Sequence, residues 1–164
     1  MQFHFRKGDD KDKEHLQALG LMAYGQHKSA MSPENWATYY AFMSNPETFT
    51  YLMKTSTCFL CETDNQIIGM AFLVSKGHPT EMFDANWSYI RMVGVHPTFG
   101  GNGIAKKLTQ LCIEHAQNTG ENFVALHTSE FMHAARHIYE KMGFKKFREL
   151  QRYGKRYWVY LMEV

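Results

Sequence analysis

The sequence predicts an α/β fold: a mixed central β-sheet flanked by helices, in the order β-α-α-β-β-β-α-β-α-β-β. Two observations predict it. Apolar segments typical of strands alternate along the chain with segments whose apolar residues recur at helical spacing. The chain has 164 residues, of which 45% are hydrophobic and 15% aromatic, which allows a sizeable core and argues against disorder. We therefore expect a single domain over residues 1–164.

The first half of the chain is expected to begin with a strand and to end with a β-hairpin. Residues 2–6 alternate apolar and polar, with Phe3 and Phe5 on one face, which is typical of a half-buried strand. Two helical segments follow, the second with a proline in its first turn. In chain order we expect a helix capped by Asp9 or Asp10, a helical segment from Ser32-Pro33, and strands over 57–62 and 66–74 that turn at Asp64-Asn65.

The second half of the chain is expected to alternate strands and helices and then to close with two strands. A glycine ends the second helix, as glycine often does at a helix C-terminus. In chain order we expect a strand over 87–95, a helix over 102–118, a strand over 123–127, a helix over 131–142 ended by Gly143, and strands over 144–150 and 157–163.

A glycine-rich turn, Gly100-Gly101-Asn102-Gly103, joins the apolar strand to the helix that follows it. A helix N-terminus presents unpaired N–H groups and a partial positive charge, and glycines let the backbone approach a phosphate closely. The turn is neither a Walker A loop, which needs a Gly-Lys-Ser/Thr triplet, nor a Rossmann fingerprint, because Lys106 stands at the third glycine position. We therefore expect a pyrophosphate cradle of another type.

Two motifs in this order resemble the GCN5-related N-acetyltransferase (GNAT) superfamily, over a matched core of residues 90–144. The family pattern V-x-P-x-x-R/Q-G-x-G-I-G/A matches Val95, Pro97, Gly101, Gly103, Ile104 and Ala105. The later pattern Y-E-x-x-G-F matches Tyr139, Glu140, Gly143 and Phe144.

The resemblance implies that acetyl-CoA is the co-substrate and that no metal is needed. It implies an N-acetyltransferase that acts on a primary amine of a small molecule or peptide. By resemblance the Tyr139 hydroxyl is the general acid that protonates the departing thiolate. The implied cofactor-binding residues are Val93, Gly94 and Val95 on the strand, and Gly101, Asn102, Gly103, Ile104, Ala105 and Lys106 at the loop.

The sequence departs from the family pattern at three positions. Gly100 replaces the Arg or Gln that usually opens the phosphate loop, and Met132 replaces an Asn often found seven residues before the tyrosine. Tyr89 stands where an acidic residue often precedes the central strand, so the general base is open among Glu81, Asp84, His78, His127 and a water chain. A non-catalytic acyl-CoA-binding regulatory domain is therefore the alternative function.

Several further expectations concern mechanism and the acceptor. The three cysteines lie away from the expected thioester, so we expect direct attack by the amine in a ternary complex without an acyl-enzyme. Gly94 either marks a β-bulge or permits close packing. By resemblance, the early helices cover the acceptor side. Two roles are open for the aromatic residues, lining an acceptor pocket or ordinary packing in the core; the residues are Tyr24, Trp36, Tyr39, Tyr40 and Trp87.

Composition argues against several partners. The net charge of +2 is too small for the strongly basic surface that binds nucleic acid, so we expect no nucleic-acid partner. No apolar run reaches the length of a membrane span, so we expect no membrane association. A local basic excess over residues 141–156 is either a solvated edge or help with an anionic ligand such as the 3′-phosphate of CoA. His133 and His137 have metal-ligand spacing but no partnering carboxylate, so no metal site is expected.

Cysteine usage indicates the compartment. Cys58, Cys61 and Cys112 form an odd set without a secretory segment, which fits a cytoplasmic location. Cys58 and Cys61 form a C-x-x-C pair within a predicted strand, where residues three apart point to opposite faces, so we expect both to be structural. The resemblance allows a homodimer, and no sequence signal decides the oligomeric state.

Overall fold

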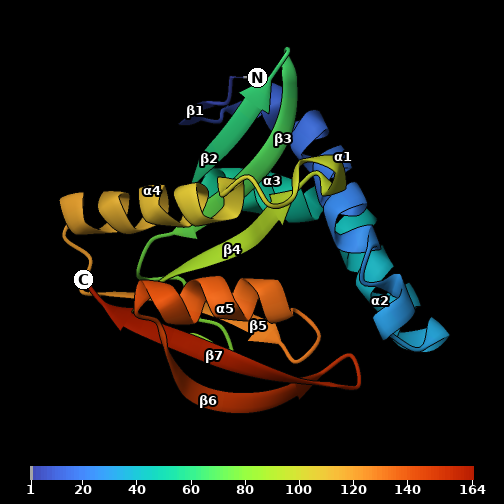
Figure 1. Cartoon of the computed structure of the whole chain (residues 1–164). Helices are drawn as coiled ribbons and strands as arrows, with labels where there is room; N and C mark the ends of the chain where they lie inside the picture. The colour runs from blue at the N-terminus through green and yellow to red at the C-terminus, as the bar shows by residue number, and fades with distance from the viewer. Residues whose placement is uncertain (1) are drawn as a thin grey trace.

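The computed structural model describes residues 2–164, which build one mixed seven-stranded sheet in the order β1-β2-β3-β4-β5-β7-β6 (Figure 1). Neighbouring strands are antiparallel except for β4 and β5, which are parallel. The elements are β1 (His4–Lys7), α1 (Lys13–Gly25), α2 (Pro33–Ser44), α3 (Pro46–Thr55), β2 (Ser56–Thr63), β3 (Gln66–Val74), β4 (Ser88–Val95), α4 (Ile104–Asn118), β5 (Phe123–Ser129), α5 (His133–Met142), β6 (Lys145–Arg152) and β7 (Lys155–Glu163).

The predicted α/β class and mixed sheet are confirmed, and the strands follow one another along the chain as expected, with one helix more before the hairpin than the expected order contains. The helical segment that starts at Pro33 divides into α2 and α3 at Asn45. The Asn45 side chain accepts a hydrogen bond from the Glu47 amide, and Pro46 occupies the first turn of α3. Because proline disfavours helical geometry in the preceding residue, Asn45 is extended and one helix ends where the next begins.

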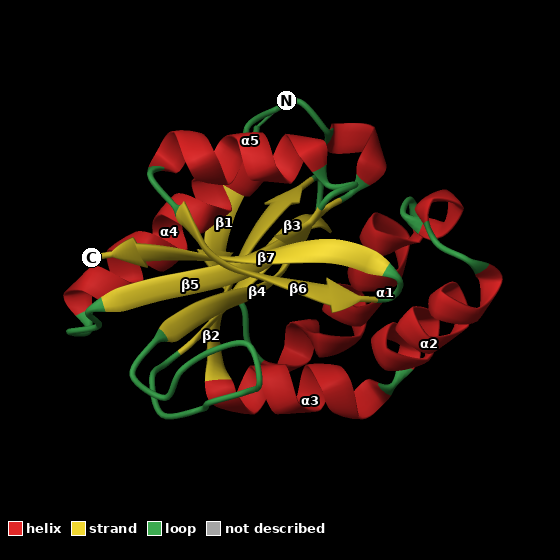
Figure 2. Ribbon diagram, turned by 90° about the horizontal axis from the view of Figure 1, so that it is seen from below, coloured by secondary structure: helices red, strands yellow, loops and turns green. Residues whose placement is uncertain are grey.

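Two layers of helices cover the two faces of the sheet. Helices α1, α2 and α3 lie on one face and α4 and α5 on the other (Figure 2). Cys58 of β2 lies in the core under α1–α3, whereas Cys61 lies in the core under α4 and α5. The expected opposite orientation of these two cysteines is confirmed, because side chains alternate along a strand.

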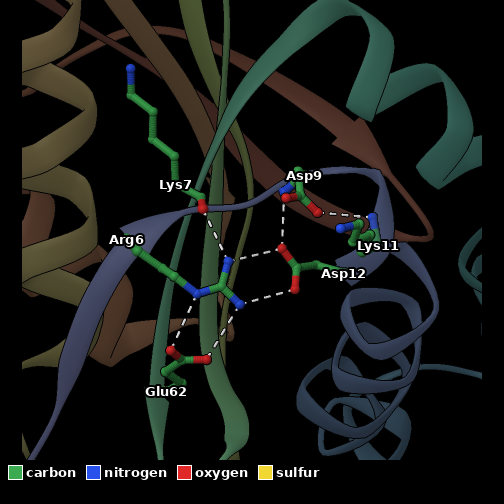
Figure 3. A network of polar contacts seen from close by, with 6 residues as sticks. All are labelled: Arg6, Lys7, Asp9, Lys11, Asp12 and Glu62. Atoms are coloured by element: carbon green, nitrogen blue, oxygen red, sulfur yellow. Dashed lines mark hydrogen bonds and ion pairs between the residues drawn. The ribbon is translucent and has the colours of Figure 1, made fainter.

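A polar network ties β1 to β2 and to the start of α1 (Figure 3). Arg6 donates to both carboxylate oxygens of Glu62, at 3.2 and 3.3 Å, and to both oxygens of Asp12, at 3.0 Å each. Asp12 also accepts from the Asp9 amide, and Asp9 accepts from the Lys11 amide, which completes a capping box. Asp9 thus caps the short 3₁₀ helix Asp10–Asp12 that leads into α1, whereas α1 itself begins after Asp12 without a side-chain cap, so the predicted cap lies one turn before the helix it was expected to start. The Arg6 guanidinium lowers the pKa of Asp12 below its ordinary value.

The sheet is split along its only parallel pair. Strands β4 and β5 pair at Ser88↔Val124 and Tyr89↔Ala125 and then diverge (Figure 1). The remainder of β4, residues 90–95, has β3 on one side and no strand on the other. This divergence leaves strand backbone and inward-facing side chains around an opening in the middle of the molecule.

Candidate functional site

The loop before α4 has a backbone suited to an anion. Gly101 and Gly103 have φ angles of 80° and 73°, a left-handed conformation that glycine adopts without strain. No amide from Gly101 to Lys106 donates to an acceptor within residues 2–164, because the helical ladder begins with the Lys107 amide and the Gly103 carbonyl. A Cβ at Gly101 or at Gly103 would meet nothing within 4 Å, so the loop faces open space.

The loop residues therefore fit a pyrophosphate. Consecutive free amides at a helix N-terminus, with the positive end of the helix dipole behind them, bind phosphate oxygens. The Asn102 side chain stabilises this shape by donating to the Phe99 carbonyl at 2.9 Å. Of the expected loop residues, Gly101, Asn102, Gly103 and Lys106 are exposed, Ala105 is half-buried, and the Ile104 side chain is buried in the core and anchors the start of α4.

Gly94 permits close packing against α1, and the bulge lies beside it. The register of β3 with β4 shifts between Arg91 and Gly94, where Met92 has a φ of 58°. A Cβ at Gly94 would lie 3.2 Å from Cε of Met70 and 3.3 Å from Cβ of Ala23, tighter than ordinary contact. Both alternatives raised for this position therefore occur, but the extra residue of the bulge is at Met92 rather than at Gly94.

A cavity of about 320 Å³ occupies the divergence of β4 and β5. Val93 lines it from β4, whereas Gly94 and Val95 do not. The Tyr24 hydroxyl donates to the Val93 carbonyl at 2.8 Å, which fixes α1 against the bulged strand. Tyr139 lines the cavity from α5. This central cavity therefore lies between the two helix layers, and Tyr139, the predicted general acid, forms part of its wall.

Tyr139 both contributes to the core and faces the cavity. It is 6% exposed, and its ring meets that of Phe144 edge to face at 5.9 Å. Burial, followed by the nearby Cys112, raises the pKa of Tyr139 above its ordinary value. The phenol therefore stays protonated at neutral and mildly alkaline pH, as a proton donor must. The neighbouring Glu140 accepts a hydrogen bond from the Tyr160 hydroxyl, which explains the Tyr-Glu pair structurally.

Among the four side chains considered as a base, His127 alone lines the cavity; His78, Glu81 and Asp84 lie in the loop between β3 and β4. Arg152 Nη1 lies 3.1 Å from His127 Nε2, so that nitrogen accepts and the proton resides on Nδ1. Burial and then the charges of Arg91 and Arg152 lower the pKa of His127. Its basic lone pair is already engaged, which argues against His127 as the base.

Two of the five aromatic residues considered for an acceptor pocket line the cavity, namely Tyr24 and Tyr39. The Trp36 ring contacts those of Tyr39 and Tyr40 on α2 in tilted geometry, but neither Trp36 nor Tyr40 lines the cavity, and Trp87 packs against Phe147 at 5.1 Å. Besides Tyr24 of α1 and Tyr39 of α2, this side of the cavity is lined by Tyr153 in the turn between β6 and β7.

Sequence reasoning missed Arg91 as a cavity residue. It lies in the otherwise apolar segment Ile90-Arg91-Met92, and a charged residue inside a buried strand was the available signal. Arg152, noted only within the basic excess, lines the same cavity. The remaining members of that excess do not line it.

The two histidines with metal-ligand spacing have separate surroundings. His133 contacts Arg136 at 2.7 Å and lines the central cavity, whereas His137 lines a second cavity of about 890 Å³ between α4 and α5. Within residues 2–164 no group of three or more His, Cys, Asp or Glu side chains could hold a metal ion. In that same range no helix is long and apolar enough to cross a membrane.

Comparison with known proteins gives a family match over most of the chain. The sequence model of the acetyltransferase (GNAT) family matches residues 23–144. N-alpha-acetyltransferase 30 of Schizosaccharomyces pombe is 37% identical over 65 residues, covering 40% of this chain and 43% of that protein. N-acetylaspartate synthetase of Danio rerio is 31% identical over 104 residues, covering 63% of this chain and 35% of that protein. The chain thus spans less than half the length of these curated relatives.

A solved structure shares the whole fold. PaiA N-acetyltransferase from Thermoplasma acidophilum, crystallised in complex with coenzyme A, superposes with a TM-score of 0.80 and covers 100% of both chains. Its sequence is 15% identical to this one, so the likeness concerns the fold.

Proposed function

Because the chain belongs to the acetyltransferase (GNAT) family, we propose that it transfers an acetyl group from acetyl-CoA to a primary amine of a small molecule or peptide. The observation that carries this proposal is that one strand connects the free-amide loop to the cavity lined by Tyr139. A loop of free amides, residues 101–106, lies at the end of the same strand that forms one wall of the cavity with Tyr139. The relatives bear the names of an N-alpha-acetyltransferase and an N-acetylaspartate synthetase, so peptide and small-molecule acceptors both remain in view.

The residues of this chain divide the binding task between the loop and β4. The amides from Gly101 to Lys106 would hold the pyrophosphate, and the unpaired edge of β4 around Val93 and Val95 would align the pantetheine. When bound, acetyl-CoA supplies an already activated thioester. A backbone N–H of the bulged strand that donated to the thioester oxygen would be worth about 2.7–4 kcal/mol in the transition state.

Tyr139 is proposed to donate its phenolic proton to the departing sulfur. A phenol of pKa about 10 is a weak acid toward a thiolate of pKa about 8.5, and burial of Tyr139 raises its pKa further. Orientation in the cavity wall therefore matters as much as acidity. The neutral amine attacks the thioester directly within a ternary complex: the new carbon–nitrogen bond forms as the carbon–sulfur bond breaks, and the proton lost by the nitrogen passes to water. No protein base is assigned, because His127 is engaged by Arg152.

The test is a matched pair of glycine variants. Gly103 and Gly120 have φ angles of 73° and 81°, and neither would place a Cβ within 4 Å of another atom. Gly103→Val and Gly120→Val therefore introduce similar backbone strain, of about 1–3 kcal/mol, but only the first obstructs the loop. We expect calorimetric titration with CoA to show at least tenfold weaker binding for Gly103→Val, with Gly120→Val close to wild type.

Equal CoA binding by wild type and Gly103→Val would remove the loop assignment. A panel of amines, assayed by thiol release from acetyl-CoA, then decides between catalysis and the alternative. CoA binding without release for any amine would indicate a non-catalytic acyl-CoA-binding regulatory domain. A cytoplasmic location belongs to the same proposal, supported by three buried cysteines that form no disulfide.

A further inference from the structure

The wall of the central cavity carries two arginine side chains and no carboxylate. Arg91 reaches it from β4, and Arg152 from the end of β6. The other polar lining consists of tyrosine, histidine, glutamine and threonine side chains, without an aspartate or glutamate. Buried charges are costly unless they are paired. A bound ligand with an anionic group would supply the negative charge that the lining of this cavity lacks.

Arg91 is the less compensated of the two. Its Nε is buried and has no hydrogen-bond partner, and its guanidinium carbon lies 5.7 Å from the centre of the Phe42 ring. No carboxylate in the described part of the chain forms a salt bridge with it. Burial and then the charge of Arg152 lower the pKa of Arg91, which places the two guanidinium groups in each other's field. The strand thus holds a partly buried cation at the cavity wall, without an ionic partner among residues 2–164.

Arg152 is oriented without being neutralised. Its Nη1 donates to the uncharged His127 at 3.1 Å and lies 3.7 Å from the sulfur of Met82. Its guanidinium carbon lies 5.3 Å from the Tyr153 ring centre and 5.8 Å from that of Tyr157. Neutral partners fix the direction of a guanidinium but leave its charge available. His127 is therefore a positioning residue for Arg152.

The side of the cavity on which the arginines lie indicates what they bind. Phe42 belongs to α2, and Tyr153 lies in the turn between β6 and β7, so both arginines lie on the acceptor side. None of the loop residues 101–106 lines this cavity, so the pyrophosphate of the co-substrate would bind elsewhere. The missing anion is therefore a group on the acceptor.

We propose that the acceptor is a small amine that also carries a carboxylate, an amino acid or a similar compound, and that Arg91 and Arg152 bind this carboxylate. The inference rests on the proposed acetyltransferase function. A guanidinium fork matches a carboxylate with two parallel hydrogen bonds. A volume of about 320 Å³ is at the small end of ligand pockets, which favours a compact acceptor. With its carboxylate held by the two arginines, the acceptor would present its amine to the part of the cavity lined by Val93 and Tyr139.

The experiment compares amines in pairs. Each common α-amino acid and ω-amino acid is assayed beside its own carboxamide by thiol release from acetyl-CoA, at saturating co-substrate. We expect the carboxylates to be used, and their advantage in kcat/KM over the amides to fall about ten- to hundredfold in Arg91→Met and in Arg152→Gln. Arg156→Gln is the matched control, because Arg156 lies over the Trp158 ring outside the cavity.

A second measurement needs no co-substrate. The N-acetylated form of the preferred acid should raise the thermal midpoint of wild type and of Arg156→Gln, but not that of Arg91→Met. Arg91→Met should also fold, because a buried unpaired charge is replaced by an apolar side chain of similar length.

The outcomes separate this inference from the function on which it rests. Absence of CoA binding by wild type would overturn the proposed function. CoA binding and turnover with neutral amines as good as their acids, or an unchanged acid-to-amide ratio in both arginine variants, would overturn the carboxylate assignment alone. A preference for phosphorylated amines over carboxylates would likewise overturn it.

Discussion

Removing the Tyr139 hydroxyl should separate chemistry from folding. The hydroxyl has no hydrogen-bond partner among residues 2–164, and the ring fills a core position at 6% exposure. Tyr139→Phe keeps the ring and its edge-to-face contact with Phe144, so the free energy of unfolding should change by no more than about 0.5 kcal/mol. A general acid contributes at least about 10²-fold, so kcat should fall by that factor, which equals about 2.7 kcal/mol of barrier.

Tyr160→Phe is the matched control on the same face of the sheet. Tyr160 is fully buried, and its hydroxyl donates to the Glu140 carboxylate. The loss of this charge-assisted bond should cost about 1–2 kcal/mol of stability and leave kcat unchanged, because Tyr160 does not line the cavity. The two variants should therefore show opposite patterns in urea denaturation and in steady-state turnover.

The assay uses an amine identified in the acceptor panel and records kcat and the CoA dissociation constant for each variant. CoA binding by Tyr139→Phe should match wild type, because the proposed proton transfer occurs only during the reaction. A kcat within threefold of wild type would refute the general-acid assignment. So would a fall in kcat that is matched by equal loss in Tyr160→Phe.

Two further variants address the covalent alternative and the polar network. A Cys58→Ala, Cys61→Ala and Cys112→Ala triple variant, if folded, should keep kcat within about tenfold of wild type (about 1.4 kcal/mol), since none of these thiols lines the cavity; burial also raises the pKa of Cys58 to about 12 and that of Cys61 to about 11. A cysteine acetyl adduct, detected by mass spectrometry, that passes its acetyl to the amine would contradict this. Asp12→Asn should lower the free energy of unfolding by about 1 kcal/mol at pH 7, because the Arg6 contact holds the folded pKa of Asp12 below its ordinary value. This stabilisation is present above the unfolded pKa of about 3.9 and is lost as the pH falls through the lower folded pKa, so denaturation curves of the two proteins that remain different at the lowest pH would argue against the ion pair as the cause.

Local signals predicted the elements well because each carries its own stereochemistry. Asp64 and Asn65 both have positive φ, as a two-residue hairpin turn requires, and Gly143 ends α5 with a φ of 106°. The number of helices after Pro33 stayed open in the sequence, because the apolar residues on both sides of Asn45-Pro46 have similar helical spacing.

The loop was predictable in more detail than the cavity. Residues 101–106 are contiguous, so a motif and the physics of a helix N-terminus suffice to place them. The cavity draws on α1, α2, β4, β5, α5 and the turn between β6 and β7, which approach one another only in the folded chain. Arg91 and Arg152 are far apart in sequence, and no local pattern states that their charges share one space. The sequence likewise could not show whether Trp36 and Trp87 line the cavity, and both lie outside it.

The short parallel contact between β4 and β5 has a mechanical consequence. Strands β1–β4 form one antiparallel part of the sheet and β5–β7 another, and two paired positions of β4 and β5 join the two parts. The Ser88 hydroxyl strengthens this junction by donating to the Phe123 carbonyl at 2.5 Å. The angle between these two parts of the sheet therefore contributes to the width of the central cavity. A substitution at Ser88 that altered this angle would change the distance between Arg91 in β4 and Arg152 in β6, although neither arginine is itself substituted.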